Sequence, residues 1–396
     1  MQMDLRSKYR RKKKMSSSLF KLGTTVKSKQ TRLFLGDDVT NRNIQTYHDP
    51  KYPFLLEAAE ELRALGNWSK NEIDLSKEKT SMDSLTEAGR HVFESGLKFA
   101  IALDSCAGRG PLQLFNDYGI SNNPEWELYL TNHQNNELLH SESYTEMVRA
   151  IFNDVDNFID SIIQDEEVQA RAESILSYFD KATAVLDKRM VNDLIPGTYS
   201  DIDDHEVRKA IYRSALTLNM FEGIRFFSTF ATAWSFSEQP EKLFSGSGNV
   251  FKLIARDEMI HLDVFQKVIR MLRTDESEGF VEVAQELEEE TYDMFTTAFR
   301  EEMLWIDHLF SKGTPLIGMN DQILKEYIEF IFCVRMENIG LDYTKIGLVK
   351  HNNPLPWMDN YLDSSHIKAA PQEIESVNYV AAIDSSKDED IDLDDL

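Results

Sequence analysis

Long stretches with apolar residues at three- and four-residue intervals dominate this sequence. They run over residues 84–106, 205–237, 249–273, 280–311 and 321–339, with glycine or proline near several of their ends. This spacing places the apolar side chains on one face of a helix. Alternating β-branched runs, which would predict strands, are nearly absent. Several predicted helices approach or exceed about 25 residues and have wide apolar faces, which predicts an all-α bundle of helices buried side by side.

The chain is long enough to bury a large core. Its 396 residues are 42% hydrophobic, with 17 glycines, 10 prolines and 2 cysteines, which excludes a disordered protein or a disulfide scaffold. No flexible linker interrupts the sequence before its last quarter. We therefore expect one helical domain over residues 31–365, preceded by a basic, flexible arm over residues 1–30 and followed by a mobile tail over residues 366–396.

Charge gathers at the two ends of the chain. Residues 1–14 carry seven lysines and arginines against one aspartate, and residues 384–396 carry seven acids against one lysine, so the two ends cancel. The net charge of −25 therefore belongs to the body, which would repel phosphates, and this argues against nucleic-acid binding. For the basic arm, the sequence leaves open a nucleic-acid or targeting segment, a disordered extension, or a true start at Met15.

The sequence carries no recognisable signal for export or membrane insertion. It has no run of about 18 apolar residues, and its basic first residues lack the apolar stretch of a secretory signal. Cys106 and Cys333 lie far apart and outside any metal or redox motif, which suits a reducing compartment. These features predict a cytoplasmic protein that does not contact a membrane.

Two Glu-x-x-His motifs are the strongest chemical signal. Glu137 with His140, and Glu258 with His261, each lie in an otherwise apolar turn of a predicted helix. Residues three apart lie on the same side of a helix, so the carboxylate and the imidazole can reach one metal ion together. A single such motif occurs by chance and usually faces solvent. Two in one helical chain favour a metal site in the core of the bundle.

Asp104 and Glu222 supply one carboxylate from each of two further predicted helices. Both lie within apolar runs, where an isolated carboxylate is costly to bury without a partner or a metal. Taken singly, either acid would be interpreted as ion-paired or solvated. The order repeats, however, because an acid precedes the motif by 33 residues in one pair and by 36 in the other. This repetition predicts two helix pairs around one dinuclear centre, whose four carboxylates and two imidazoles suit iron or manganese.

Tyr144 follows His140 by four residues and therefore projects from the same helix face. A tyrosine at such a place ordinarily fills the core, but beside an oxygen-activating metal pair its phenol would be oxidisable. We expect three apolar side chains around it: Phe226, Phe230 and Ile254. They can be ordinary core residues and also the wall that protects a radical from quenching.

These motifs resemble the small, radical-generating subunit of class I ribonucleotide reductase. The similarity spans roughly residues 60–383. The matching segments are Trp68, Glu72–Ser76, Asp104-Ser105, Glu137–Tyr144, Phe221–Phe226, Leu253–Leu262, Asn353–Trp357 and Ala370–Tyr379. The resemblance implies a ferritin-like helical bundle that uses O2 at a dinuclear metal centre and passes an oxidising equivalent to a separate catalytic subunit, which reduces ribonucleotides for DNA synthesis.

The resemblance also implies a role for each matching residue. One metal ion would be bound by Asp104, Glu137 and His140, and the other by Glu222, Glu258 and His261, with Glu137 and Glu258 placed to bridge. The ions would be two Fe or, alternatively, two Mn, and the sequence does not choose between them. Tyr144 would carry a stable tyrosyl radical after O2 oxidises the reduced metals.

A path for the oxidising equivalent is implied as well. It would run from His140 through Asp257 and Trp68 to Tyr379 in the tail, with Glu373 as a proton acceptor or docking residue. Without the resemblance, Trp68 would be a core anchor and Asp257 a partner of Arg256. The acidic tail would dock on the large catalytic subunit, although it could instead only aid solubility. A homodimer is expected, and a flavodoxin-like activator would accompany manganese.

Three other functions compete with this interpretation. The same scaffold could be a ligand-binding oxidase or a desaturase-like enzyme, a ferroxidase that stores iron, or a helical scaffold that has lost its metal. Tyr144 and Tyr379 favour the radical subunit, because a self-contained oxidase has no use for a relay tyrosine outside its fold. The length of the chain argues against a ferritin cage, and the complete ligand set argues against a metal-free scaffold.

Overall fold

A computed structural model describes residues 32–36, 45–66, 68–107, 114–115, 120–121, 123–194 and 203–362. These residues form helices and no strand, so the predicted all-α bundle is confirmed. None of the described helices combines the length and the apolar character needed to cross a membrane. The basic arm and the tail, with Glu373 and Tyr379, lie outside the described residues, and the predicted domain boundaries stay predictions.

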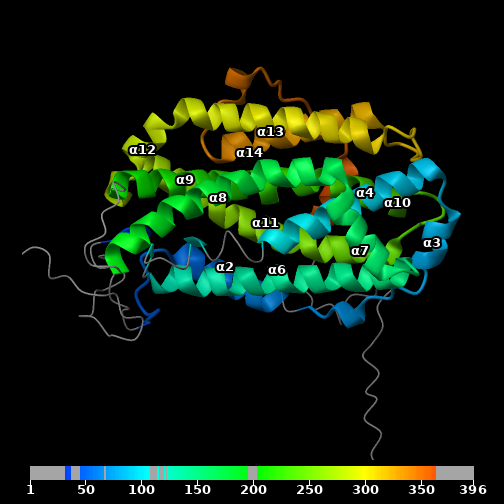
Figure 1. Ribbon diagram of the computed structural model, residues 1–396, viewed down its shortest axis with the longest axis horizontal. Helices are drawn as coiled ribbons and strands as arrows, with labels where there is room; N and C mark the ends of the chain where they lie inside the picture. Colours follow the sequence, from blue (N-terminus) through cyan, green and yellow to red (C-terminus); the bar gives the residue numbers. More distant parts are fainter. Residues whose placement is uncertain are drawn as a thin grey trace, which may run out of the picture.

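Figure 1 shows the helices in their order along the described residues. The longer ones are α2 (Pro53–Leu65), α4 (Glu87–Ala107), α6 (Pro124–Ile151), α7 (Val155–Gln164), α8 (Glu166–Leu194), α9 (Asp204–Met220), α10 (Phe226–Ser237), α11 (Ser245–Thr274), α13 (Glu288–Leu309) and α14 (Asp321–Asn338). The shorter ones are η2 (Lys70–Glu72), α3 (Glu78–Ser84), η3 (Phe221–Arg225), η4 (Glu276–Glu278), α12 (Val281–Glu286), η5 (Tyr343–Ile346), η6 (Pro356–Met358) and α15 (Asp359–Leu362).

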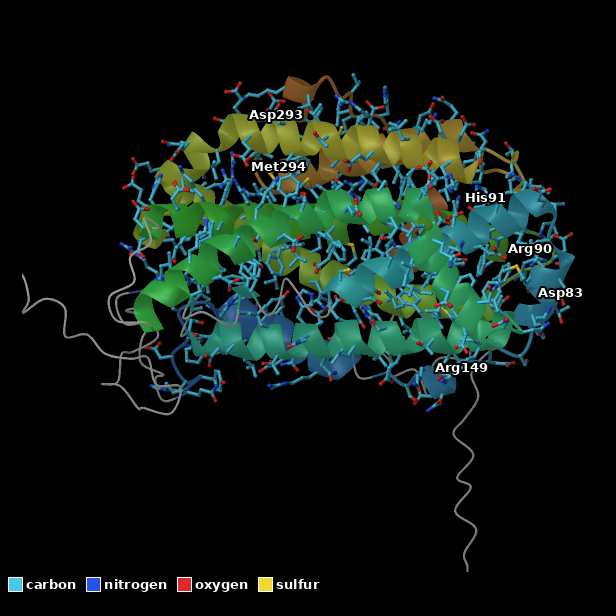
Figure 2. All side chains as sticks on the ribbon, viewed as in Figure 1. Asp83, Arg90, His91, Arg149, Asp293 and Met294 are labelled. Atoms are coloured by element: carbon cyan, nitrogen blue, oxygen red, sulfur yellow. The ribbon has the colours of Figure 1, made fainter. Side chains whose placement is uncertain are left out.

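The long helices lie roughly alongside one another, with α6 along the lower edge of Figure 1 and α13 along the upper edge. Helix α6 packs against α2, α4 and α11, and α11 also packs against α9 and α10. Side chains fill the space between the helices (Figure 2). Asp293 and Met294 on α13 show the pattern, because the first is exposed and the second is buried.

The start of α6 explains how this helix is fixed in place. Asn123 precedes the helix, and its side-chain Oδ1 accepts a hydrogen bond of 2.9 Å from the backbone N–H of Trp126. Pro124 occupies the first helical position, where no backbone donor is needed. Trp126 is completely buried. The side chains one to five turns further along α6 therefore enter the core from a firmly anchored helix.

Two predicted helices differ from the expected form. The stretch 280–311 breaks at Leu287, which lets α12 pack against α9 while α13 packs against α14. The stretch 205–237 contains a π-helical turn, η3, between α9 and α10. Single π turns interrupt α-helices frequently at functional sites. This one carries Glu222.

Buried arginines hold the π turn in position. The backbone oxygen of Gly223 accepts a hydrogen bond from Nε of Arg335 at 3.0 Å, and that of Arg225 accepts one from Nη2 of Arg171 at 2.9 Å. A Cβ atom on Gly223 would lie 2.7 Å from a methyl carbon of Leu262, so any larger residue here would have to displace that side chain on α11. The turn is thereby pressed against α11 with Glu222 completely buried.

Candidate metal centre

The six predicted ligands converge from four parts of the bundle. They are Asp104 from α4, Glu137 and His140 from α6, Glu222 from η3, and Glu258 and His261 from α11. Each is at most 1% exposed to solvent. They form two adjoining groups in which the possible ligand atoms lie within 4.8 Å of one another, and Glu137 belongs to both. The bundle thus brings the whole predicted set together.

Glu258 lies between the two groups. Its Oε1 is 3.2 Å from Nδ1 of His140, and its Oε2 is 3.4 Å from Nδ1 of His261. Glu137 Oε1 is likewise 3.4 Å from Nδ1 of His261. Two carboxylates that face both halves of the centre are the arrangement that bridging of two ions requires.

All but one of the possible ligand atoms of the six residues have no hydrogen-bond partner, the exception being Nε2 of His140. This holds for both carboxylate oxygens of Asp104, Glu137, Glu222 and Glu258, for Nδ1 of His140 and for both ring nitrogens of His261. Buried polar atoms are normally paired, because burying them alone costs free energy. A dense set of oxygen and nitrogen donors without partners fits bound cations. The residues therefore fit a site for two metal ions with mixed oxygen and nitrogen ligands.

The pKa values of three residues in the cluster favour their protonated forms, and they are those of Asp104, Glu222 and His261. Burial raises the pKa of Asp104, with the nearby charges of Glu137 and Glu258 adding to the effect, and burial raises the pKa of Glu222 to about 7. Burial alone would lower the pKa of His261, but its contacts with Glu137 and Glu258 raise it to about 10. Metal binding must displace these protons, so it is coupled to pH.

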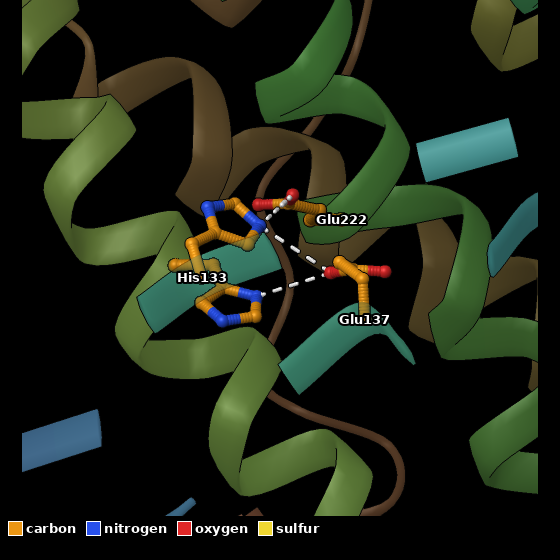
Figure 3. Close-up of side chains that lie close together, drawn as sticks. His133, Glu137 and Glu222 are labelled. Atoms are coloured by element: carbon orange, nitrogen blue, oxygen red, sulfur yellow. Dashed lines mark ion pairs between the residues drawn. The ribbon is translucent and has the colours of Figure 1, made fainter. Parts of the chain in front are cut away.

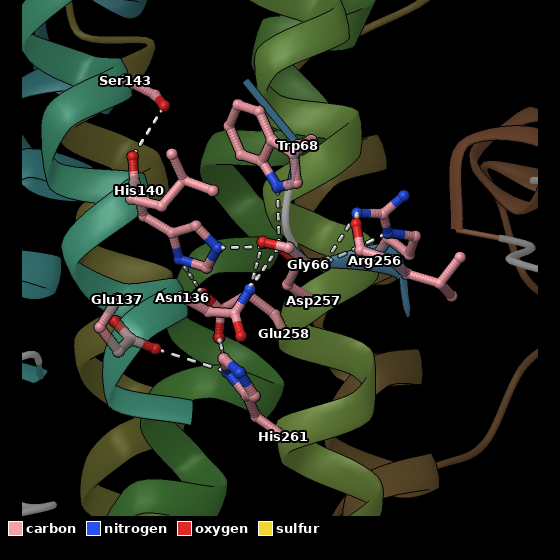
Figure 4. A network of polar contacts seen from close by, with 12 residues as sticks. Gly66, Trp68, Asn136, Glu137, His140, Ser143, Arg256, Asp257, Glu258 and His261 are labelled. Atoms are coloured by element: carbon pink, nitrogen blue, oxygen red, sulfur yellow. Dashed lines mark hydrogen bonds and ion pairs between the residues drawn. The ribbon is translucent and has the colours of Figure 1, made fainter. Parts of the chain in front are cut away.

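Asp257 contacts His140 at Nε2, while Nδ1 of the same ring faces Glu258 (Figure 4). Oδ2 of Asp257 accepts hydrogen bonds from Nε2 of His140 at 3.3 Å, from the indole N–H of Trp68 at 2.9 Å and from the amide of Asn136 at 3.2 Å. Its Oδ1 accepts from Nε and Nη2 of Arg256 at 3.1 and 3.0 Å. Asp257 is therefore both the partner of Arg256 and the link between His140 and Trp68, which sequence reasoning had treated as alternatives.

Tyr144 is buried next to the Asp104 group, and its hydroxyl has no hydrogen-bond partner. Burial, and then the charge of Asp104, raises the pKa of Tyr144 well above its ordinary value. The ring in contact with Tyr144 is Phe251, at 6.0 Å between centroids. Sequence reasoning missed Phe251, although its position seven residues before Glu258 places it on the same face of α11.

The three predicted apolar neighbours are completely buried: Phe226, Phe230 and Ile254. Phe230 lies 6.1 Å from Phe251 and stacks on Phe226 at 5.7 Å, centroid to centroid. Phe230 thus forms the layer behind Phe251. Phe251, which was not predicted, makes an aromatic contact with Tyr144, and the predicted wall of Phe226, Phe230 and Ile254 around the phenol stays a prediction.

His133 is the second residue that sequence reasoning missed. It lies one turn before Glu137 on α6, and its Nε2 is 3.1 Å from Oε1 of Glu222 and 3.3 Å from Oε1 of Glu137 (Figure 3). Its ring stacks on that of His261, with centroids 3.5 Å apart. The signal in the sequence was the spacing of four residues between His133 and Glu137, which places both on one face.

Comparison with known proteins identifies the family. The family model described as "Ribonucleotide reductase, small chain" matches residues 45–344. A protein of Escherichia coli named "Ribonucleoside-diphosphate reductase 1 subunit beta" is 34% identical over 372 residues, which cover 92% of this chain and 94% of the relative. The beta subunit of Haemophilus influenzae is 32% identical over 373 residues, covering 92% and 95%.

Solved structures show the same fold. The ribonucleotide reductase R2 subunit of Clostridium botulinum aligns with a TM-score of 0.72 and 21% identity, covering 88% of this chain and 99% of that one. An R2-like ligand-binding oxidase with a Mn/Fe cofactor aligns with a TM-score of 0.55 and 18% identity, covering 76% and 97%. The match to the family model and the identity to the beta subunits confirm the resemblance found in the sequence. The chain belongs to the family of ribonucleotide reductase small chains.

Proposed function

We propose that this protein is the radical-generating small subunit of a class I ribonucleotide reductase. It acts with a large catalytic subunit that reduces ribonucleotides to deoxyribonucleotides. The observation that carries the proposal is the buried cluster of four carboxylates and the imidazoles beside them, most of whose oxygen and nitrogen atoms make no hydrogen bond, with the phenol of Tyr144 next to it. When two iron ions, or alternatively two manganese ions, are bound, they provide the redox chemistry with O2.

The residues divide the work between holding metal and storing the oxidising equivalent. Asp104 and His140 belong to one half of the centre, Glu222 and His261 to the other, and Glu137 and Glu258 face both. Tyr144 stores the oxidising equivalent as a radical. Burial of the phenol among aromatic rings keeps water and reductants away from it.

Transfer to the large subunit starts at His140 and proceeds through Asp257 to Trp68. The hydrogen bonds that Asp257 accepts from both side chains support this path. Beyond Trp68 we propose Tyr379 and Glu373 of the tail, which lie outside the described residues, and docking of the acidic tail on the large subunit. Two copies of the chain form a homodimer. If the ions are manganese, a flavodoxin-like activator provides the oxidant.

A ligand-binding oxidase is the second candidate, because a solved oxidase of that kind shares the fold. In such an enzyme the oxidising equivalent would be used on a bound substrate and no tyrosyl radical would accumulate. A ferroxidase would likewise oxidise metal without a protein radical. Beta subunits that match over 92% of the chain favour the radical subunit.

The experiment that tests the proposal is EPR spectroscopy after anaerobic loading with Fe(II) or Mn(II) and exposure to O2. We expect a tyrosyl signal in the wild type, and in the manganese sample only with a flavodoxin-like activator. Tyr144→Phe should bind metal normally and lose the signal. Tyr212→Phe is the matched control, because Tyr212 is a buried tyrosine that pairs with Arg273. Metal oxidation without a radical under every loading would contradict the proposal and support an oxidase or ferroxidase.

A further inference from the structure

His133 is a completely buried imidazole beside the metal centre that the six predicted ligands leave without a role. We propose that His133 is a third imidazole ligand of the dinuclear centre and that its Nε2 binds the ion held by Glu222 and His261. The inference rests on the proposed function, since it requires the cluster to hold two metal ions.

The position of His133 on α6 carries the first part of the argument. His133, Glu137 and His140 lie four and three residues apart, so one helix face presents all three side chains to the core. The Nε2 atom of His133 belongs to the same compact group of donor atoms as Glu137, Glu222 and His261. Although it lies 3.1 Å from Glu222, the geometry makes no hydrogen bond, and Nε2 is among the buried atoms without a partner. A ring nitrogen directed into a cluster of unpaired carboxylates is placed as a ligand.

The contact behind the ring carries the second part. Nδ1 of His133 is 3.1 Å from the hydroxyl of Tyr129, and that hydroxyl donates a hydrogen bond of 3.4 Å to the backbone oxygen of His261. With its proton directed to this carbonyl, the Tyr129 hydroxyl leaves its oxygen available to accept the Nδ1–H of His133. We assign this tautomer, which leaves the lone pair of Nε2 facing Glu137 and Glu222. Metal-binding histidines usually donate their second ring N–H to such a partner.

The alternative is that His133 only donates a hydrogen bond to Glu222 and thereby orients that ligand. Its proton would then sit on Nε2, and Tyr129 would donate to Nδ1. The two arrangements place the proton on opposite ring nitrogens. In the ligand arrangement a metal ion lies between Nε2 and the carboxylates, and in the alternative the Nε2 proton lies there. Only the ligand arrangement gives the two ions unequal numbers of nitrogen ligands. One ion would be bound by His140, and the other by both His133 and His261.

The decisive measurement is a crystal structure of the full chain loaded anaerobically with Mn(II), with the ions located by anomalous scattering. We expect two ions, one of them coordinated by Nε2 of His133. Equilibrium titration with Mn(II) then shows which of the two ions depends on His133. His133→Asn retains a polar group towards Tyr129 and removes the distal ring nitrogen. The affinity of the chain for one of the two ions should fall by about 100-fold, and the affinity for the other should not change.

His308→Asn is the matched control, because His308 is a half-buried histidine whose ring stacks on Trp305 away from the centre. Two ions with Nε2 of His133 hydrogen-bonded to Glu222 and bound to neither ion would overturn the inference, whatever the affinities of His133→Asn, and would leave the proposed function intact. A wild-type chain that binds no pair of ions would overturn the proposed function and the inference with it. Since the loaded wild-type structure needs no variant, the inference stays testable if His133→Asn does not fold.

Discussion

The two halves of the metal centre share a Glu-x-x-His motif but differ in what stands behind the histidine. Behind His140 lies Asp257, a buried charge that joins the imidazole to Trp68, Asn136 and Arg256. Behind His261 lies the ring of His133, stacked at 3.5 Å, and no charged residue takes the place of Asp257 among its described contacts. The same Glu-x-x-His motif therefore has two different surroundings. In one half the histidine is hydrogen-bonded to a charged network around Asp257, and in the other it is stacked on the imidazole ring of His133.

The surroundings of His140 and His261 differ because of how the helices pack, since the Glu-x-x-His motif itself is the same in both halves. His140 projects from α6 towards α11 and the residues that follow α2, whereas His261 projects from α11 back towards an earlier turn of α6. In the proposed function the first half exports the oxidising equivalent and the second half only holds its ion. Changes to either half should then have separable effects.

Removing the carboxylate shared by the halves should have the largest effect. Glu137→Ala takes a donor from both groups at once, so we expect loss of both tightly bound ions. Metal content after anaerobic loading and desalting measures this directly. Glu142→Ala is the control, since Glu142 is an exposed acid on the same helix that pairs with Lys70 at 3.1 Å. A variant that still bound one ion with wild-type affinity would show that the halves are independent.

Asp257→Asn should separate the halves. The amide no longer provides the negative charge that orients His140, so the ion of the Asp104 and His140 half should bind about 10–100-fold more weakly. The ion of the Glu222 and His261 half should be unaffected. Titration with Mn(II) resolves the two steps, and Asp263→Asn, an exposed acid paired with Lys267 on the same helix, is the control. Equal weakening of both ions would refute the division into halves.

Residue spacing was sufficient to predict most of the centre. The repeated order of an acid and a Glu-x-x-His motif identified six of the seven residues that the bundle brings together, because each of the six is a polar side chain within an apolar helix face. Trp68 and Asp257 required the family resemblance, since nothing local to residue 68 indicates a partner 189 residues away. The roles of all these residues stay predictions, as do those of Glu373 and Tyr379.

Other features depend on tertiary packing and left little local signal. His133 and Phe251 lie on the correct helix faces, but a lone histidine or phenylalanine at helical spacing is ordinarily core. The π turn that carries Glu222 depends on Arg335, which reaches Gly223 from a helix 112 residues further along the chain. Its existence therefore follows from contacts that no segment contains alone.

The stability of the metal-free chain should fall as pH rises, and bound metal should remove this fall. Burial raises the pKa of Glu222 to about 7, so between its unfolded value of 4.5 and about 7 the folded metal-free chain holds a proton that the unfolded chain has released. Stability of this form then falls as pH rises, by up to about 1.4 kcal/mol per pH unit. His261, whose pKa is raised to about 10, extends the fall above pH 6.5. Bound cations replace these protons.

We therefore expect the increase in Tm caused by Mn(II) to be larger at pH 8 than at pH 6, as measured by calorimetry of the loaded and metal-free chains. Glu222→Gln should flatten the decline of the metal-free form between about pH 5 and pH 7. An increase in Tm that is the same at both pH values would show that the protons assigned to the cluster are not displaced by metal.

Trp68→Phe should have the smallest effect on the centre and so distinguish support of the metal from transfer. The variant loses one hydrogen bond to a buried charge, which costs about 1.5–3 kcal/mol of stability. Asp257 keeps its bonds with His140, Asn136 and Arg256, so both ions should bind as in the wild type. The radical on Tyr144 should also form. If Trp68 lies on the path to the large subunit, ribonucleotide reduction should nevertheless be lost, because phenylalanine is much harder to oxidise than tryptophan. A variant with normal turnover would leave Trp68 as a core anchor, and the two halves would then differ only in how they hold their ions.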